Sequence, residues 1–224
     1  RRSKHGNFAL KLDISKAFDT IKWSFIFQVL SRYGFSGSFI KLVSSILNSA
    51  RASVLINGSP KGFFPCSRGV RQGDPLSGIL FAIAEDYLSR CLIDLTQAGL
   101  FSPIMAGRNL QVPSHLFYAD DILLFGQADR RTLSSIRRIF QHYEYVAGQA
   151  ISWSKSSIVF GDGVSTSRQT RIALSLGVKR GSIPFDYLGV PIFWGRVKSS
   201  YLMNTASRIL PQLAKWKGKC LSQA

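Results

Sequence analysis

The sequence predicts an α+β fold in which a mixed or antiparallel sheet packs against helices. Short segments with strand-like apolar patterns alternate with longer segments whose apolar residues recur at helical spacing. The pair Asn57-Gly58 separates two apolar runs, which is a strong signal for a tight β-hairpin. A second hairpin is predicted where apolar runs at residues 116–117 and 122–125 flank an acidic turn. Strands that alternate with helices and also pair through hairpins are typical of this class.

The first part of the chain is predicted to hold one strand, two helices and the Asn-Gly hairpin. Residues 8–13 alternate between apolar and polar and end on an acid, as a half-buried strand does. Apolar residues then recur at helical spacing over residues 25–33 and 39–47, and Gly34 suits the end of the first helix. The hairpin strands are expected at residues 53–56 and 63–64.

The longest helix is predicted to begin at Pro75 and to end at Gly99. Asp74 suits the N-cap position, and proline is favoured at the first helical position. One apolar stripe is expected to face the core. It comprises Leu76, Ile79, Leu80, Ile83, Tyr87, Leu88, Cys91, Leu92 and Leu95.

The last part of the chain is predicted to contain helices at about residues 130–145 and 167–176, and strands near 158–160 and 187–192. A basic helix is expected over residues 201–220, with Pro211 interrupting it. One group of arginines in the first of these helices could face nucleic acid, although a solvated surface is the simpler interpretation. It comprises Arg130, Arg131, Arg137 and Arg138.

The composition indicates a folded chain with a polyanionic partner. The chain has 224 residues, of which 46% are hydrophobic, so intrinsic disorder is excluded as its general state. Its 29 Lys and Arg against 12 Asp and Glu give a net charge of +17, which favours nucleic acid as the partner. The apolar stretches are too short to span a membrane, so a soluble chain with no membrane partner is expected. The three cysteines show neither metal-site nor disulfide spacing.

The acids Asp120 and Asp121 indicate metal-dependent chemistry. They lie between two apolar runs, and their segment contains no Lys or Arg to pair with them. Burying two such anions is costly unless a cation neutralises them. If the fold brings Asp13, at the end of a strand, to the same place, the three carboxylates could hold two divalent ions for phosphoryl transfer. The alternative is an exposed acidic turn, with Asp13 simply ending its strand.

Four segments in this order resemble motifs A, B, C and E of the reverse transcriptase family, in the form found in non-LTR (LINE-type) retrotransposons, especially those of plants. They are residues 12–19 (LDISKAFD), 71–77 (RQGDPLS), 118–121 (YADD) and 187–192 (YLGVPI). The resemblance implies an RNA-directed DNA polymerase. It also implies a polymerase palm, an antiparallel sheet backed by helices, with part of the fingers at residues 1–195 and the start of a helical thumb at 196–224.

The resemblance assigns the chemistry to four residues. Asp13 and Asp120 match the main metal-binding carboxylates of the family, and Asp121 matches the third, less directly coordinating one. The implied cofactor is a pair of Mg²⁺ ions, which Mn²⁺ could replace. Lys155 resembles the motif D lysine that protonates the leaving pyrophosphate, although its segment matches more loosely.

The resemblance also implies contacts with the nucleotide, the primer and the template. Phe18 matches an aromatic steric gate against the 2′-hydroxyl, while Ala17 leaves room for the nucleotide. Ordinary core packing is the alternative for Phe18. Gln72 and Gly73 match the loop that touches the templating pair. Contacts with the primer end are expected from Tyr187, Leu188 and Gly189, and contacts with the nucleic-acid backbone from Arg68, Arg71, Lys215 and Lys217.

The implied partners are an RNA template, a DNA primer and a deoxynucleoside triphosphate. The remaining fingers and thumb and an endonuclease are expected from a longer polyprotein, and a nuclear location is implied by the resemblance alone. Two alternatives stay open. One is a catalytically inactive, truncated fragment that only binds nucleic acid; the other is an RNA-templated RNA polymerase, against which Phe18 argues.

Overall fold

The computed structural model describes residues 6–104, 112–193, 196, 199–200, 202–203, 206–207 and 209–211. The chain forms two compact units, Arg1–Arg180 and Gly181–Ala224, and each is described by itself. The division between palm and thumb after residue 195 stays a prediction.

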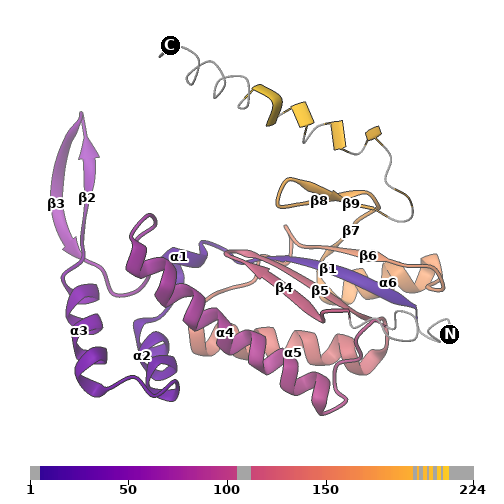
Figure 1. Ribbon diagram of the computed structural model, residues 1–224, viewed down its shortest axis with the longest axis horizontal. Helices are drawn as coiled ribbons and strands as arrows, with labels where there is room; N and C mark the ends of the chain where they lie inside the picture. Colours follow the sequence, from indigo (N-terminus) through magenta and orange to yellow (C-terminus); the bar gives the residue numbers. More distant parts are fainter. Residues whose placement is uncertain are drawn as a thin grey trace, which may run out of the picture. The chain divides into compact units, whose positions relative to one another are not determined.

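A five-stranded sheet is the centre of the first unit, with strand order β4-β5-β1-β6-β7 (Figure 1). The strands are β1 (Asn7–Asp13), β4 (His115–Tyr118), β5 (Asp121–Gln127), β6 (Ser157–Phe160) and β7 (Lys179–Arg180). Strand β1 is antiparallel to both β5 and β6, and only the short β7 pairs in parallel, with β6. The predicted α+β class with a mixed, largely antiparallel sheet is therefore confirmed.

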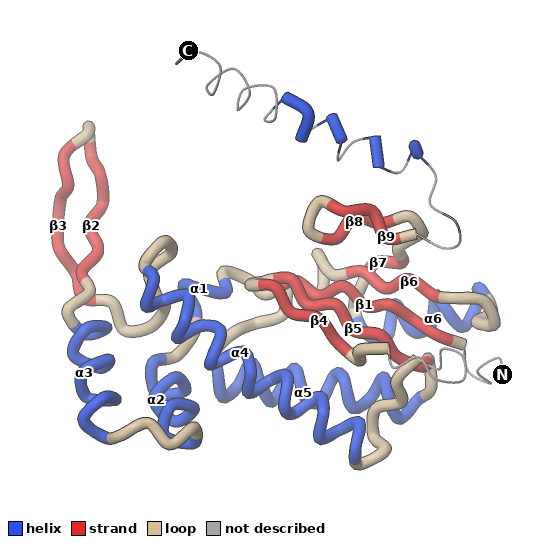
Figure 2. Tube along the Cα trace, in the orientation of Figure 1, coloured by secondary structure: helices blue, strands red, loops and turns tan. Residues whose placement is uncertain are grey.

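Within the described residues of the first unit, six helices accompany the sheet, and α4 and α5 run along one side of it (Figure 2). They are α1 (Ala17–Thr20), α2 (Trp23–Arg32), α3 (Gly37–Asn48), α4 (Pro75–Gln97), α5 (Arg130–Ala147) and α6 (Thr166–Leu176). The predicted start of α4 is confirmed, since the Oδ1 of Asp74 accepts a hydrogen bond from the backbone N–H of Leu76 at 3.0 Å. This cap satisfies one of the donors that a helix start leaves unpaired.

The period-2 pattern of the central strands separates a core face from an open face. Leu10 and Leu12 of β1 are fully buried in one cluster with Leu88 of α4 and Phe140 of α5. The residues that alternate with them, such as Lys11 and Asp13, are only half-buried. The helices therefore cover one face, and the polar residues of β1 belong to the other.

The buried side of α4 differs from the predicted stripe. Ile79, predicted to face the core, is 58% exposed, while Ser77, Ala84 and Glu85 are buried. Because α4 carries apolar residues around most of its circumference, spacing alone did not determine which side faces the sheet.

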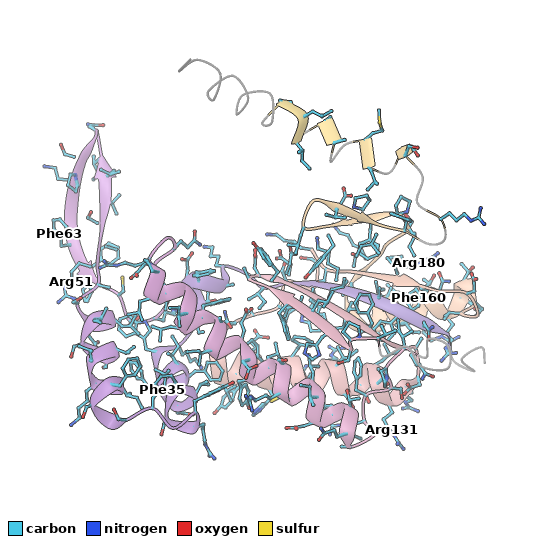
Figure 3. The ribbon with its side chains drawn as sticks, viewed as in Figure 1. Phe35, Arg51, Phe63, Arg131, Phe160 and Arg180 are labelled. Atoms are coloured by element: carbon cyan, nitrogen blue, oxygen red, sulfur yellow. The ribbon has the colours of Figure 1, made fainter. Side chains whose placement is uncertain are left out.

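The predicted Asn-Gly hairpin is present as β2 (Arg51–Ile56) and β3 (Ser59–Pro65). Asn57 and Gly58 both have positive φ, 49° and 77°, as a two-residue turn of this kind requires. Strand β3 is exposed along its length and β2 at every position except Ala52 and Ser53. Figure 3 labels Arg51 at the base of the hairpin and Phe63 on β3.

The second unit contains a short hairpin, β8 (Phe185–Tyr187) and β9 (Val190–Ile192). Residues 187–192, predicted to be strand, form the end of β8, a turn at Leu188 and Gly189 with φ of 52° and 77°, and β9. Pro211, predicted to interrupt the tail helix, is helical, and residues 212–224 lie outside the described part. No helix within the described ranges is long and apolar enough to cross a membrane.

Candidate active site

Asp13 and the Asp120-Asp121 pair meet at one end of the sheet. Asp13 closes β1, Asp121 opens β5, and the antiparallel register places these two residues opposite each other. Beside them, the backbone N–H of Ile14 donates to the carbonyl oxygen of Asp120 at 2.9 Å. The strand pairing therefore brings Asp13 to the Asp120-Asp121 pair, which is far from it in the sequence.

The turn that presents Asp120 is strained. Ala119 has a φ of +51°, a region that costs a residue other than glycine about 1 kcal/mol or more. Asp120 follows it and is exposed to solvent. Strain of this kind is found most often at functional sites, where the surrounding structure holds an unfavourable conformation.

Asp121 has a cationic partner, so the expectation that both acids of the turn lack one was wrong. The Nζ of Lys11 lies 3.6 Å from the Oδ1 of Asp121, and the two side chains are 32% and 27% exposed. Lys11 comes from the neighbouring strand β1, so the sequence of the acidic segment alone does not reveal this ion pair. Within the described part of the chain, Asp13 and Asp120 form no ion pair.

The donor set at this sheet end suits a hard cation. Mg²⁺ is usually held by one or two carboxylates, with water and substrate phosphates completing its shell. Among the described residues, no group of three or more His, Cys, Asp or Glu side chains could enclose a metal ion. Asp13 and Asp120 therefore fit an open site that the substrate completes. The role of third ligand for Asp121 stays a prediction.

A turn that carries Lys155 is attached to the strand end of Asp13. The backbone N–H of Ser152 donates to the carbonyl oxygen of Asp13 at 2.8 Å. The backbone N–H of Asp13 donates to the Oγ of Ser156 at 3.3 Å. Lys155 is exposed between these two anchors. The fold thus brings the Lys155 turn to the acids, while the role of its ammonium group stays a prediction.

The segment after β1 holds Ala17 and Phe18 against the core. Ala17 is buried, and the ring of Phe18 stacks on Phe81 of α4 with centroids 4.4 Å apart and an interplanar angle of 13°. The carbonyl oxygen of Phe18 accepts a hydrogen bond from the backbone N–H of Val70 at 2.7 Å. Phe18 is therefore half-buried and fixed in place, and its role as a gate stays a prediction.

Gly69 ties the loop before α4 to the same segment. Its N–H donates to the carbonyl of Ile21 at 2.8 Å, and its own carbonyl accepts from the Nε1 of Trp23 at 2.6 Å. Its φ is +81°, and a Cβ atom there would lie 2.6 Å from the carbonyl oxygen of Asp19. Only glycine satisfies both constraints without a shift of the backbone.

Arg68, Arg71 and Gln72 line one cleft of about 500 Å³ beside this loop. Asp19 and Asp74 lie in the same lining, so the two arginines and the two acids give it no formal net charge. Gly73, with a φ of +88°, follows Gln72 in the exposed loop. The cleft thus gathers three predicted contact residues, although their roles remain predictions.

Sequence reasoning missed a buried polar group beneath these loops. The hydroxyl of Tyr143 donates to the Oε1 of Gln149, whose Nε2 donates to the carbonyl oxygen of Ala17 at 2.9 Å. Burial raises the pKa of Tyr143, and the nearby Glu85 raises it further. Glu85 is itself buried, and its pKa is raised to about 8, first by burial and then by the charge of Asp120. The sequence signal for this buried group was an acidic residue, Glu85, between the apolar Phe81 and Leu88 on the core side of α4.

The remaining predicted site residues lie in the second unit. Tyr187 is buried at the end of β8, and Leu188 and Gly189 form the turn of the hairpin. Lys215 and Lys217 fall outside the described residues. The primer and backbone contacts assigned to these residues stay predictions.

The fold defines a class of protein, a polymerase palm. Telomerase from Candida albicans, solved with a fragment of telomeric RNA, aligns with 84% of this chain and 29% of its own at a TM-score of 0.58 and 14% identity. Truncated apo telomerase from Candida tropicalis aligns with 71% of this chain and 32% of its own at a TM-score of 0.52 and 18% identity. At these identities, the likeness establishes the fold alone.

The sequence comparisons assign the chain to a protein family. A profile described as reverse transcriptase (RNA-dependent DNA polymerase) matches residues 1–192, so the chain belongs to the reverse transcriptase family. It is 30% identical over 211 residues to the transposon TX1 uncharacterized 149 kDa protein of Xenopus laevis, which covers 93% of this chain. It is 33% identical over 120 residues, 54% of the chain, to the Pol polyprotein of the retrotransposable element R2DM of Drosophila melanogaster.

These relatives confirm the predicted resemblance to non-LTR retrotransposon proteins. The chain spans only 15% of the Xenopus protein and 11% of the Drosophila one. What the whole proteins do therefore does not transfer directly to this chain.

Proposed function

We propose that the chain is the palm of an RNA-directed DNA polymerase, which joins a deoxynucleoside triphosphate to the 3′-hydroxyl of a DNA primer on an RNA template. The observation that carries this proposal is the meeting of Asp13 with the turn of Asp120 at one sheet end. Membership of the reverse transcriptase family supports the reaction class.

Asp13 and Asp120 would hold the metal ions in this proposal. Two bound Mg²⁺ ions, or Mn²⁺ in their place, lower the pKa of an attacking hydroxyl and neutralise charge on the phosphates. Asp121 supports the site through its ion pair with Lys11. The exposed Lys155, on the turn attached to Asp13, donates a proton to the leaving pyrophosphate.

The neighbouring loops position the nucleotide and the nucleic acid. Phe18 lies one residue beyond Ala17 and, stacked on Phe81, excludes a 2′-hydroxyl from the sugar position. Gln72 and Gly73 touch the templating pair, and Arg68 and Arg71 reach phosphates from the same cleft. Tyr187 and its hairpin support the primer end. Lys215 and Lys217, at the start of the thumb, reach the nucleic-acid backbone. The remaining fingers and thumb and an endonuclease belong to a longer polyprotein.

Primer extension on an RNA template tests the proposal. Asp120→Asn removes a charge from an exposed turn residue, so we expect it to abolish extension while RNA binding persists. Undiminished extension by this variant would refute the metal role.

The same assay distinguishes the alternatives. RNA binding by the unaltered chain without extension, even with Mn²⁺, would favour an inactive fragment that only binds nucleic acid. Preferential use of ribonucleotides would favour an RNA-templated RNA polymerase.

A further inference from the structure

A groove of about 700 Å³ lies between α5 and α6, distinct from the cleft beside Gln72. Four arginines line it: Arg130 and Arg137 from α5, and Arg168 and Arg171 from α6. Among the described residues that line the groove, none is acidic. The cleft beside Gln72 balances two arginines with two acids, so the groove is the more strongly positive of the two.

The charges in the groove are not neutralised within the described part of the chain. The two ion pairs formed there involve Lys11 with Asp121 and Arg90 with Asp86, and none of the four groove arginines. Asp129, which precedes α5, accepts hydrogen bonds from the N–H and the Oγ1 of Thr132 as the helix cap. Four arginines that line one groove, with no acidic side chain among its described lining residues, favour a polyanion.

Two of the arginines are held in position by neutral groups. An Nη1–H of Arg137 donates to the carbonyl oxygen of Ser175 at 2.6 Å, which links α5 to α6. An Nη2–H of Arg168 donates to the carbonyl oxygen of Ala128 at 2.6 Å. A guanidinium group has five N–H donors, so these bonds fix the side chains and leave donors for phosphate oxygens.

Hydroxyl groups complete the lining. Ser134, Ser165, Ser167 and Ser175 all line the groove, and Ser165 is the N-cap residue of α6. Its side chain makes no cap hydrogen bond to the helix backbone. Arginine and serine side chains together are the usual partners of phosphate oxygens in nucleic-acid complexes.

The groove also lies apart from the acids. Ile136 and Phe140 of α5 and Ile172 of α6 are buried in the core cluster with Leu10. Asp13 lies on the opposite face of β1 from Leu10 and Leu12, by the alternation of the strand. A strand held between α5 and α6 would therefore leave the candidate active site open.

We infer that the groove between α5 and α6 binds the phosphate backbone of single-stranded RNA at a second site, away from polymerisation. RNA is the strand meant because the inference rests on the proposed function, in which RNA is the template. The volume of the groove is that of a ligand pocket, which suits a few nucleotides of one strand. The groove anchors the template while the sheet end copies another part of it.

Charge reversal with a matched control tests the inference. Arg130→Glu and Arg171→Glu together reverse the two groove arginines that make no structural hydrogen bond to a carbonyl. Arg131→Glu and Arg138→Glu together change the net charge equally, from exposed positions of α5 that do not line the groove (Arg131 is labelled in Figure 3). Affinity for a labelled single-stranded RNA is then measured across salt concentrations.

The groove variant should bind RNA about tenfold more weakly or worse. The slope of its log affinity against log salt concentration should fall in magnitude by at least about 1.4, because each lost phosphate contact contributes about 0.7 to that slope. The control variant should keep both values close to those of the unaltered chain. Equal losses in the two variants, no loss in the groove variant, or equally strong competition by an acidic peptide would overturn the inference. Arg130→Gln with Arg171→Gln, which add no negative charge, should give a smaller loss in the same direction.

The outcome is separable from that of the proposed function. Asp120→Asn should keep groove-dependent RNA binding, because Asp120 is not part of the groove lining. If that variant retains extension, the proposed function fails while the groove stands. If the groove variant binds RNA normally, the inference fails whatever the extension assay gives.

Discussion

The ion pair between Lys11 and Asp121 lies beside Asp13, which faces Asp121 directly across the β1–β5 ladder. Without the ammonium group, two carboxylates would face each other on adjacent strands. Like charges in that position destabilise a sheet by about 0.2–1 kcal/mol. The lysine therefore allows the two acids to share one sheet end.

Lys11→Met should lower the free energy of unfolding by up to about 1 kcal/mol at low salt, because methionine keeps the aliphatic stem and removes the charge. The loss should shrink with added salt, since the pair is partly exposed. Urea denaturation at two ionic strengths measures it. Adding Asp121→Asn should recover most of the lost stability; a variant as stable as the unaltered chain at low salt would contradict the account.

Phe18→Ala should relax the choice of sugar. If the stacked ring excludes the 2′-hydroxyl, its removal should raise the use of ribonucleotides relative to deoxynucleotides by about tenfold to a hundredfold. Single-nucleotide extension with matched rNTP and dNTP measures the ratio. Phe81→Leu is the control, because it removes the stacking partner and leaves the ring of Phe18. An unchanged ratio in Phe18→Ala would assign Phe18 to core packing alone.

Features with local causes could be predicted from the sequence. The start of α4 depends on Asp74 and Pro75, and the first hairpin depends on Asn57 and Gly58, so each follows from a few adjacent residues. The strand end at Asp13 followed from alternation and the acidic turn from its apolar flanks. Their meeting across the sheet was an expectation that the register of β1 with β5 bears out.

Features that depend on tertiary contacts could not be predicted in this way. Lys11 reaches Asp121 from another strand. Which side of α4 is buried depends on how the helix packs in the folded chain. The two-residue strand β7 is too short to leave a pattern. The basic groove needs two helices side by side, so the arginines of α5 alone could not distinguish it from a solvated surface.

Gly69→Ala should disrupt the loop before α4. The added Cβ would lie 2.6 Å from a backbone oxygen of Asp19 at a φ of +81°, so we expect a loss of about 1–3 kcal/mol in unfolding free energy. Gly78→Ala is the matched control, because a Cβ there meets nothing within 4 Å in the first turn of α4. Alanine should stabilise that helix by about 0.5–1 kcal/mol. Thermal denaturation of both variants checks the contrast; equal effects would contradict it.

Glu85 should make the stability of the protein fall as the pH rises. Its pKa is raised from 4.5 in the unfolded chain to about 8 in the fold, mainly by burial. Between these values the folded state keeps a proton that the unfolded state has released, so each pH unit costs up to about 1.4 kcal/mol of stability. The contribution is fully present below about pH 4.5 and is lost by about pH 8. This direction is opposite to that of a salt-bridged carboxylate.

Glu85→Gln should remove that dependence, because the amide resembles the protonated acid and cannot ionise. Among the described residues, Oε1 of Glu85 has no hydrogen-bond partner. The amide adds an N–H donor to this buried place, and because the amide does not titrate, any penalty for it should be independent of pH. Urea denaturation at about pH 5 and about pH 8 measures this. The free energy of unfolding of the variant, relative to that of the unaltered chain, should be higher by a few kcal/mol at about pH 8 than at about pH 5. Glu144→Gln, at an exposed position of α5, should show no such gain. Parallel pH profiles for Glu85→Gln and the unaltered chain would mean that Glu85 is ionised in the fold, and the buried acid would then need a cation to neutralise it.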